Sequence, residues 1–197
     1  YTFMVHSTTH IANAHMYQKL PYDTMKDFVP VALMAAQPGA LVVHPSMPVK
    51  TTKEFLDLAR KRPGQINYSS SGSGSAVHLS MSLLMQMTNT NVVHIPYKGG
   101  VPQTTAVVSG ETQAAMVAIA TALGQIQSGR IRALGVTTPR RSIVLPDVPT
   151  LGETVPGYEM ATWIAAFAPA GTPKAIVDRM HDEINRTIAR PDVNKTL

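Results

Sequence analysis

The sequence predicts an α/β fold, in which short apolar strands alternate with amphipathic helices. Strand-like segments such as 66–68 and 114–118 are short and apolar, and each is followed by a polar or small-residue loop and then by an apolar pattern of helical period. Helix-start signals, Thr51 with Glu54 and later Pro102, stand where two of the helical patterns begin. The repeated order of strand, loop and helix predicts parallel strands covered by helices.

In the N-terminal part of the chain, the sequence predicts strands at residues 1–5, 27–34 and 40–43. A polar loop at 6–10 and a short helix from Ile11, extending toward residue 20, are expected after the first strand. The break at Gln37-Pro38-Gly39 is consistent either with a passage from one lobe to another or with an ordinary turn. Thr51 and Glu54 form a capping box, whose helix is expected to bury three residues and to end at Pro63-Gly64. The three residues are Phe55, Leu58 and Ala59.

The stretch Ser69–Ser75 contains only serine and glycine and lies between an expected strand and a helix that begins at Ala76. A segment without bulky side chains leaves backbone N–H groups free at the positive end of the helix dipole, which predicts an anion site. The same stretch is also typical of a simple turn in which Ser73 or Ser75 caps the helix. Both interpretations remain open on local pattern alone.

The remaining chain continues the alternation, with strands expected at 91–95, 114–118 and 131–136. The helix after the serine-glycine stretch is expected to bury Ala76, Leu79, Leu83 and Met87. Because neighbouring parallel strands end at one edge of a sheet, the serine-glycine stretch, Tyr97-Lys98-Gly99 and the end of Met116-Val117-Ala118 are expected to meet there.

The C-terminal part begins with a long proline-bearing connection at 140–150, which is expected on the surface. A strand is expected at 163–168, and a helix follows with Thr172 as N-cap and Pro173 at its first position. That helix is expected to end at Pro191. Its apolar stripe consists of Ile176, Val177, Met180, Ile184 and Ile188.

Composition narrows the range of functions. The 197 residues carry a net charge of +5 and no cysteine, which excludes disulfides and cysteine-based metal sites. The basic residues occur in small separate groups with few aromatics between them, so a small anion is a better partner than a nucleic acid. His6, His10 and His15 have no carboxylate at hand, so we expect structural or surface roles for them, with neither a metal nor a cofactor. No apolar run approaches the length of a bilayer-spanning helix.

Several segments, in this order, resemble the Bug or TctC family of solute receptors of tripartite tricarboxylate transporters, over nearly the whole chain. They are LPYD (20–23), KDFVPV (26–31), LVVHPS (41–46), PG (63–64), NYSSSG (67–72), HIPYKG (94–99), LPDVPT (145–150) and FAPAGTP (167–173). The resemblance implies a type II periplasmic binding protein, with two α/β lobes joined by crossing strands and a ligand cleft between them. Residues 1–40 and 165–197 would form lobe 1, and residues 41–164 would form lobe 2.

The resemblance also implies a function. Such a receptor captures a small organic carboxylate in the periplasm and delivers it to membrane permease subunits without performing chemistry, and we expect a monomer. The family's first strand and glycine-rich loop have no counterpart before Tyr1, and a segment beyond Leu197 is also missing. We therefore expect lobe 1 to be incomplete at both ends, and the chain to be a piece of a longer protein.

By the same resemblance, the ligand-binding residues come from both lobes. They are Ser7, Thr8 and Thr9 in lobe 1, and Ser70, Ser71, Gly72, Ser73, Gly74, Ser75, Tyr97, Lys98, Gly99 and Ala118 in lobe 2. Many relatives have an aspartate where Ala118 stands. Because an acidic residue would suit a ligand ammonium group, its absence favours a plain mono- or dicarboxylate over an amino acid.

Two other classes of function compete with a receptor. A hydrolase of small anions would use Ser71 or Ser75 as nucleophile and His78 or His94 as base, but no acid is placed to orient the histidine. The dinucleotide motif G-x-G-x-x-G does not fit, because Val77 stands where its third glycine would be needed. No Gly-Lys-Ser/Thr follows for a nucleotide P-loop, and no G-x-S-x-G nucleophile elbow occurs. A ligand-sensing domain of a transcription regulator would share the two-lobe plan.

Overall fold

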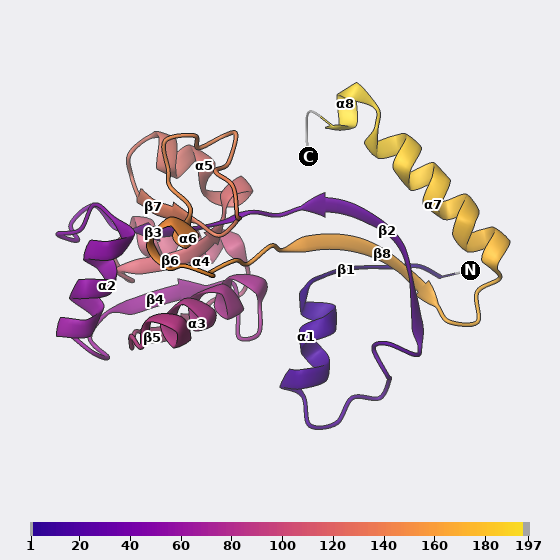
Figure 1. Ribbon diagram of the computed structural model, residues 1–197, viewed down its shortest axis with the longest axis horizontal. Helices are drawn as coiled ribbons and strands as arrows, with labels where there is room; N and C mark the ends of the chain where they lie inside the picture. Colours follow the sequence, from indigo (N-terminus) through magenta and orange to yellow (C-terminus); the bar gives the residue numbers. More distant parts are fainter. Residues whose placement is uncertain (1, 195–197) are drawn as a thin grey trace. The chain divides into compact units, whose positions relative to one another are not determined.

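A computed structural model describes residues 2–194. The chain divides into two compact units: unit 1 combines residues 1–36 with 162–197, and unit 2 is the continuous segment 37–161. The chain therefore passes from one unit to the other twice, as can be followed by colour in Figure 1. The boundaries expected from the sequence, after residues 40 and 164, fall a few residues later than these passages.

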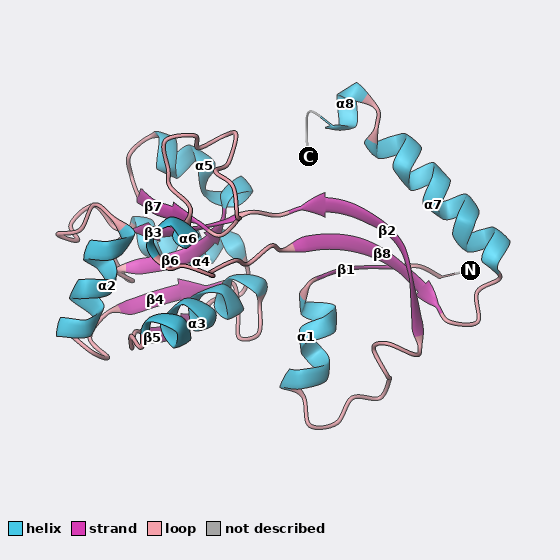
Figure 2. Cartoon of the chain, viewed as in Figure 1, coloured by secondary structure: helices cyan, strands magenta, loops and turns pink. Residues whose placement is uncertain are grey.

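Unit 1 contains a three-stranded antiparallel sheet of order β1-β8-β2 within the described residues. The strands are β1 (Met4–Ser7), β2 (Phe28–Ala36) and β8 (Trp163–Pro169), and the helices are α1 (Thr9–Met16), α7 (Lys174–Ile188) and α8 (Pro191–Asn194) (Figure 2). Val177, Met180 and Ile184 of α7 pack against the buried cluster of Val31, Ala166 and Ala168. These three belong to the stripe that the helical period predicted.

Three details of unit 1 differ from the sequence-based expectation. The first strand continues through His6 and Ser7, which shortens the expected polar loop, while Tyr1 lies outside the described residues. Helix α1 ends at Met16, and His10 rather than the 46% exposed Ile11 is its buried residue. The N-cap of α7 is Pro173 instead of Thr172, without a side-chain cap. The strand extends because its residues pair with β8, a distant segment that local patterns do not reveal.

Unit 2 contains a five-stranded mixed sheet of order β5-β4-β6-β3-β7 within the described residues. Its strands are β3 (Gly39–Val43), β4 (Asn67–Ser70), β5 (Val93–Pro96), β6 (Ala114–Ala118) and β7 (Arg132–Val136). Strand β4 runs parallel to β5 and β6, as predicted, but β3 runs antiparallel to β6 and β7. The chain reaches β3 directly from β2 without a crossover helix, and only a crossover forces a parallel strand.

Helices cover both faces of the unit 2 sheet. They are α2 (Thr52–Lys61), α3 (Ala76–Thr88), α4 (Gly100–Val108), α5 (Ile119–Gln127) and α6 (Leu151–Thr154). Alternate residues of β3 face two different clusters: Leu41 packs with residues of α2, α3 and α6, whereas Val42 packs with residues of α4 and α5. The predicted capping box of Thr51 and Glu54 is confirmed. No helix within residues 2–194 is both long and apolar enough to cross a membrane.

The buried face of α3 was predicted wrongly. The helix buries Val77, Ser80, Met81 and Leu84 instead of Ala76, Leu79, Leu83 and Met87. Met81 is fully buried, whereas Met87 is 40% exposed. The helix carries apolar residues on nearly all of its sides, so two of its faces have similar apolar content. Packing against the sheet decides which of these faces is buried.

In unit 2, Arg141 of the proline-bearing connection forms an ion pair with Glu153, and Glu153 also caps helix α6. The carboxylate of Glu153 accepts two hydrogen bonds from Arg141, at 3.0 and 2.8 Å, and caps α6 by accepting the Thr150 amide at 3.0 Å. The Arg141 hydrogen bonds, followed by the Thr150 amide, lower the pKa of Glu153 to about 2. A carboxyl whose pKa is lower in the folded state stabilises the fold above its unfolded pKa and loses that contribution as the pH falls.

We therefore expect the free energy of unfolding to decrease between about pH 4.5 and pH 2, and Glu153→Gln to make this decrease shallower. Urea unfolding at several pH values in this window measures the effect. Glu159→Gln is the matched control, because Glu159 is exposed and makes no ion pair within residues 2–194. Equal slopes for Glu153→Gln and the unmodified protein would contradict the expectation.

Candidate anion-binding site

The serine-glycine stretch forms the connection between β4 and α3. Ser69 and Ser70 are buried residues of β4, so the irregular loop is limited to residues 71–74. Ser75 is the N-cap of α3, and its Oγ accepts the His78 amide at 3.3 Å, which confirms the predicted cap. The turn interpretation is thus correct for Ser75, and it leaves the rest of the segment to be explained.

Glycine is required at two positions of the loop. Gly72 has φ of +129° and Gly74 has φ of +78°, both in the region that L-residues rarely adopt. A Cβ on Gly72 would also lie 3.5 Å from the Tyr97 carbonyl oxygen of the neighbouring loop. These conformations turn the chain sharply and bring its amides toward the start of α3.

The amides of this segment divide into two groups. Gly72 donates to Ser70 Oγ at 3.2 Å, Gly74 to His78 Nδ1 at 3.0 Å and Ser75 to the Gly72 carbonyl at 3.2 Å, so these three amides are used internally. The other group has no acceptor anywhere within residues 2–194, and we call it the amide cluster. It consists of the backbone N–H groups of Ser71, Ser73, Ala76 and Val77. Unpaired amides at the N-terminus of a helix are a favourable environment for an anion.

The loop after β5 lies beside the serine-glycine segment. The Tyr97 amide donates to the Ser70 carbonyl at 2.9 Å, and the Gly99 amide donates to the Ser71 carbonyl at 3.3 Å. Lys98 is exposed and forms no ion pair in the described part of the chain. The Tyr97 hydroxyl donates to Glu111 at 2.8 Å, and desolvation together with Glu111 raises the Tyr97 pKa to about 12. Tyr97 therefore contributes backbone contacts here, while its hydroxyl is already paired.

Gln103 joins the strands beneath the loops, and sequence reasoning missed it. Its side-chain Nε2 donates to the carbonyls of Ser69, at 3.1 Å, and Met116, and it is 1% exposed. It thereby ties the end of β4 to the end of β6, where Ala118 is the N-cap of α5. The available signal was a glutamine directly after Pro102, in an expected helix of mostly small and apolar residues.

The histidines considered as catalytic bases form a stacked pair. The rings of His78 and His94 lie 4.1 Å apart at 21°, and His94 Nε2 is 2.6 Å from Ser70 Oγ. Burial lowers the pKa of both imidazoles, and His78 further lowers that of His94. Ser75 Oγ is paired with the amide of His78 and not with its ring, and no carboxylate hydrogen-bonds to either ring within residues 2–194. This arrangement has no nucleophile, base and acid in series.

The predicted residues of unit 1 have unequal roles. Thr8 Oγ1 accepts the Trp163 amide at 3.0 Å, and the Thr8 amide donates to the Trp163 carbonyl at 3.1 Å, so Thr8 serves the junction of β1 and β8. Ser7 Oγ and Thr9 Oγ1 lie 3.0 Å apart and share a hydrogen bond. This pair of half-buried hydroxyls retains capacity for a further acceptor.

Other candidate features lie away from the amide cluster. One hollow of about 270 Å³, between α4 and α5, is lined by Thr104, Thr121, Gln125 and Arg130 among others. His10 packs among Tyr22, Phe28 and Phe167, which is a structural role. Within residues 2–194 no group of three or more histidine, aspartate or glutamate side chains is arranged to hold a metal ion.

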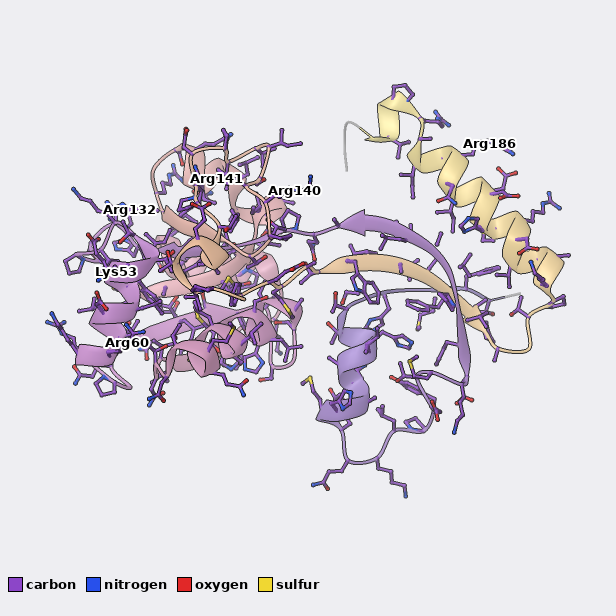
Figure 3. All side chains as sticks on the ribbon, viewed as in Figure 1. Lys53, Arg60, Arg132, Arg140, Arg141 and Arg186 are labelled. Atoms are coloured by element: carbon purple, nitrogen blue, oxygen red, sulfur yellow. The ribbon has the colours of Figure 1, made fainter. Side chains whose placement is uncertain are left out.

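The basic residues are distributed over many elements. Figure 3 labels Lys53 and Arg60 on α2, Arg132 on β7 and Arg186 on α7. Lys53 and Arg60 both pair with Asp57, and Arg186 pairs with Glu183. Lys53, Arg60 and Arg186 are thus each neutralised by a carboxylate three or four residues away on the same helix.

The fold identifies the class of protein. Two α/β units and the arrangement of their sheets match two-lobe periplasmic binding proteins, among them BugD, which is 26% identical with a TM-score of 0.89 over 98% of this chain and 65% of BugD. The family model described as "Tripartite tricarboxylate transporter family receptor" matches residues 1–197. The chain therefore belongs to the TctC family, which confirms the resemblance found in the sequence.

Individual relatives agree with this assignment. A Pseudomonas sp. protein named "UPF0065 protein in tcbD-tcbE intergenic region" is 37% identical over 199 residues, covering 100% of this chain and 59% of that protein. R. palustris Rpa4515, solved with adipate, is 33% identical with a TM-score of 0.91, covering 100% of this chain and 67% of that one. MatC from Rhodopseudomonas palustris, with bound malate, is 30% identical with a TM-score of 0.90, and the match covers 99% of this chain and 67% of MatC. The chain thus spans about three fifths of the length of the curated relative.

Proposed function

We propose that the protein containing this chain is a periplasmic solute-binding protein that captures a small organic carboxylate and delivers it to the permease of a tripartite tricarboxylate transporter. The observation that carries the proposal is the amide cluster of Ser71, Ser73, Ala76 and Val77 at the start of α3. The adipate and malate bound by two similar proteins further support a carboxylate as ligand. Family membership supports the transporter partnership and the periplasmic location.

In the proposed binding mode, the ligand carboxylate accepts hydrogen bonds from the amide cluster and from the hydroxyls of Ser71 and Ser73. Each charge-assisted bond contributes about 1.5–3 kcal/mol. Lys98, which is exposed and without an ion pair in the described chain, adds a longer-range attraction. Gly72, Gly74, Ser70 and Ser75 set the path of the loop rather than bind the ligand themselves.

The other predicted site residues take narrower roles in this proposal. Ser7 and Thr9 contribute hydroxyls from unit 1, while Thr8 holds the strand junction. Tyr97 and Gly99 brace the loop through their amides. Ala118 offers no charge to a ligand ammonium group, so we propose a plain mono- or dicarboxylate.

The proposal is tested by thermal unfolding of the full-length protein with adipate or malate. At a ligand concentration of about 100 times Kd, binding stabilises the fold by about 2.7 kcal/mol, which raises Tm by several degrees. The ligand should be recovered chemically unchanged after incubation. The uncharged diamides of the same acids are the matched control and should leave Tm unaltered. Equal stabilisation by the diamides, or consumption of the acids, would refute carboxylate capture.

A further inference from the structure

The Gly74 amide donates its hydrogen bond to a titratable ring, the imidazole of His78. His78 lies in the first turn of α3, and its Nδ1 accepts the Gly74 N–H at 3.0 Å. Gly74 is buried and adopts φ of +78°, and this hydrogen bond is the one that its amide makes within residues 2–194. An imidazole nitrogen accepts a hydrogen bond only when it carries no proton. The observed loop therefore requires His78 to be neutral with its proton on Nε2.

We infer that His78 is a positioning residue for the amide cluster, and that binding of a carboxylate at this loop requires the His78 ring to be neutral. The inference rests on the proposed function for its binding part, while the link between His78 and the loop stands on geometry alone. His78 is not proposed to contact the ligand. It acts through Gly74, which lies directly after Ser73 of the amide cluster.

The surroundings of His78 disfavour the doubly protonated, positively charged form of its ring. From β5 the ring of His94 stacks on it at 4.1 Å, and from β4 Tyr68 stacks on His94 at 5.0 Å. No ion pair with a carboxylate compensates a positive ring within residues 2–194, and burial lowers the His78 pKa below its ordinary 6.5. A histidine whose folded pKa is lowered in this way destabilises the folded arrangement as the pH falls from its ordinary pKa toward the lowered one. Protonation would place an N–H opposite the Gly74 N–H and break the bond.

A charged imidazole beside an anion site would have the opposite effect if it bound the ligand directly. In that case acidification would strengthen binding by adding a positive charge. The two mechanisms therefore predict opposite signs for the pH dependence of affinity. The hydrogen bond from Gly74 favours the positioning role, because the Nδ1 lone pair is already used in the loop.

Two variants at His78 separate acceptor geometry from packing. In His78→Asn, the side-chain Oδ1 takes approximately the position of Nδ1 and accepts the Gly74 amide without titrating. In His78→Leu, the packing volume is kept and the acceptor is lost. His15→Asn on α1 is the matched control, since the His15 side chain is exposed and makes no hydrogen bond in the described chain.

The experiment uses adipate and malate as probes, with titration calorimetry from pH 7.5 to pH 5 on the full-length protein. We expect the affinity of the unmodified protein and of His15→Asn to fall by about tenfold per pH unit below the His78 midpoint. His78→Asn should match their affinity at pH 7.5 and lose most of the pH dependence, with protonation of the probe itself as the remainder. His78→Leu should bind at least about tenfold more weakly at every pH. Equal behaviour of the Asn and Leu variants, or stronger binding at low pH, would overturn the inference.

A readout without ligand separates this inference from the proposed function. In the NMR spectrum of the ligand-free protein, the Gly74 amide resonance should titrate with the same midpoint as the His78 ring, and it should not do so in His78→Asn. If the two do not titrate together, the positioning role of His78 is wrong even where carboxylates bind. If the Gly74 amide and the His78 ring titrate together but no carboxylate binds at any pH, the link between His78 and the loop holds. The binding requirement and the proposed function then both fail.

Discussion

Gly72→Val is expected to reduce the affinity for adipate or malate on the order of 100-fold while the protein remains folded. At φ of +129° a β-branched residue is strained, and its Cβ would start 3.5 Å from the Tyr97 carbonyl oxygen. The loop must then change its path, which moves the flanking amides of Ser71 and Ser73 away from the ligand. Loss of one or two charge-assisted hydrogen bonds gives an effect of this size. Titration calorimetry, combined with circular dichroism to monitor the fold, measures it.

The control for this variant is Gly129→Val. Gly129 also has a positive φ, +70°, and a Cβ there would meet nothing within 4 Å. It lies between α5 and β7, outside the serine-glycine segment, so we expect a loss of stability of about 1–3 kcal/mol with unchanged affinity. If a folded Gly72→Val protein binds as tightly as the unmodified one, the anion site is not at this loop.

Gln103→Met is expected to lower the free energy of unfolding by about 2 kcal/mol. The substitution keeps the side-chain length but removes two hydrogen bonds in a fully buried position, each contributing about 1 kcal/mol. Because the same amide ties β4 to β6, we also expect weaker carboxylate binding at the adjoining loop. Urea unfolding and calorimetry report the two effects separately.

Gln86→Met provides the comparison for Gln103→Met. Gln86 is an exposed glutamine on α3, so the same change of side chain should alter stability by less than about 0.5 kcal/mol. A similar small effect at Gln103 would mean that its two hydrogen bonds contribute little to stability. Strands β4 and β6 would then be held together at this end by their backbone hydrogen bonds alone.

Local signals in the sequence predicted the elements that depend on local chemistry. The capping box of Thr51 and Glu54 and the N-cap at Ser75 are formed by neighbours in sequence, and both are confirmed. The break at Pro38 is also correct for this reason. The anion site itself stays a prediction, although the serine-glycine composition led directly to the loop where unpaired amides are found.

Features set by distant contacts were not accessible in this way. The antiparallel direction of β3 depends on how the chain enters unit 2, and the face of α3 depends on which side meets the sheet. The roles of Gln103 and His78 require knowing that a helix side chain reaches a particular strand carbonyl or loop amide. The hydroxyl of Thr8 accepts the amide of Trp163, far away in the chain, which the sequence could not reveal, and its role in ligand binding stays a prediction.

The double passage between the units constrains the order of folding. Unit 2 is one uninterrupted stretch, whereas the central strand of the unit 1 sheet, β8, is separated from β1 and β2 by the whole of unit 2. Closing that long loop costs entropy that only later contacts repay. During synthesis unit 2 can complete its core first, and β1 and β2 must wait for Trp163–Pro169 before they have a partner. The late-forming sheet is therefore the part of the molecule most dependent on protection from premature strand pairing.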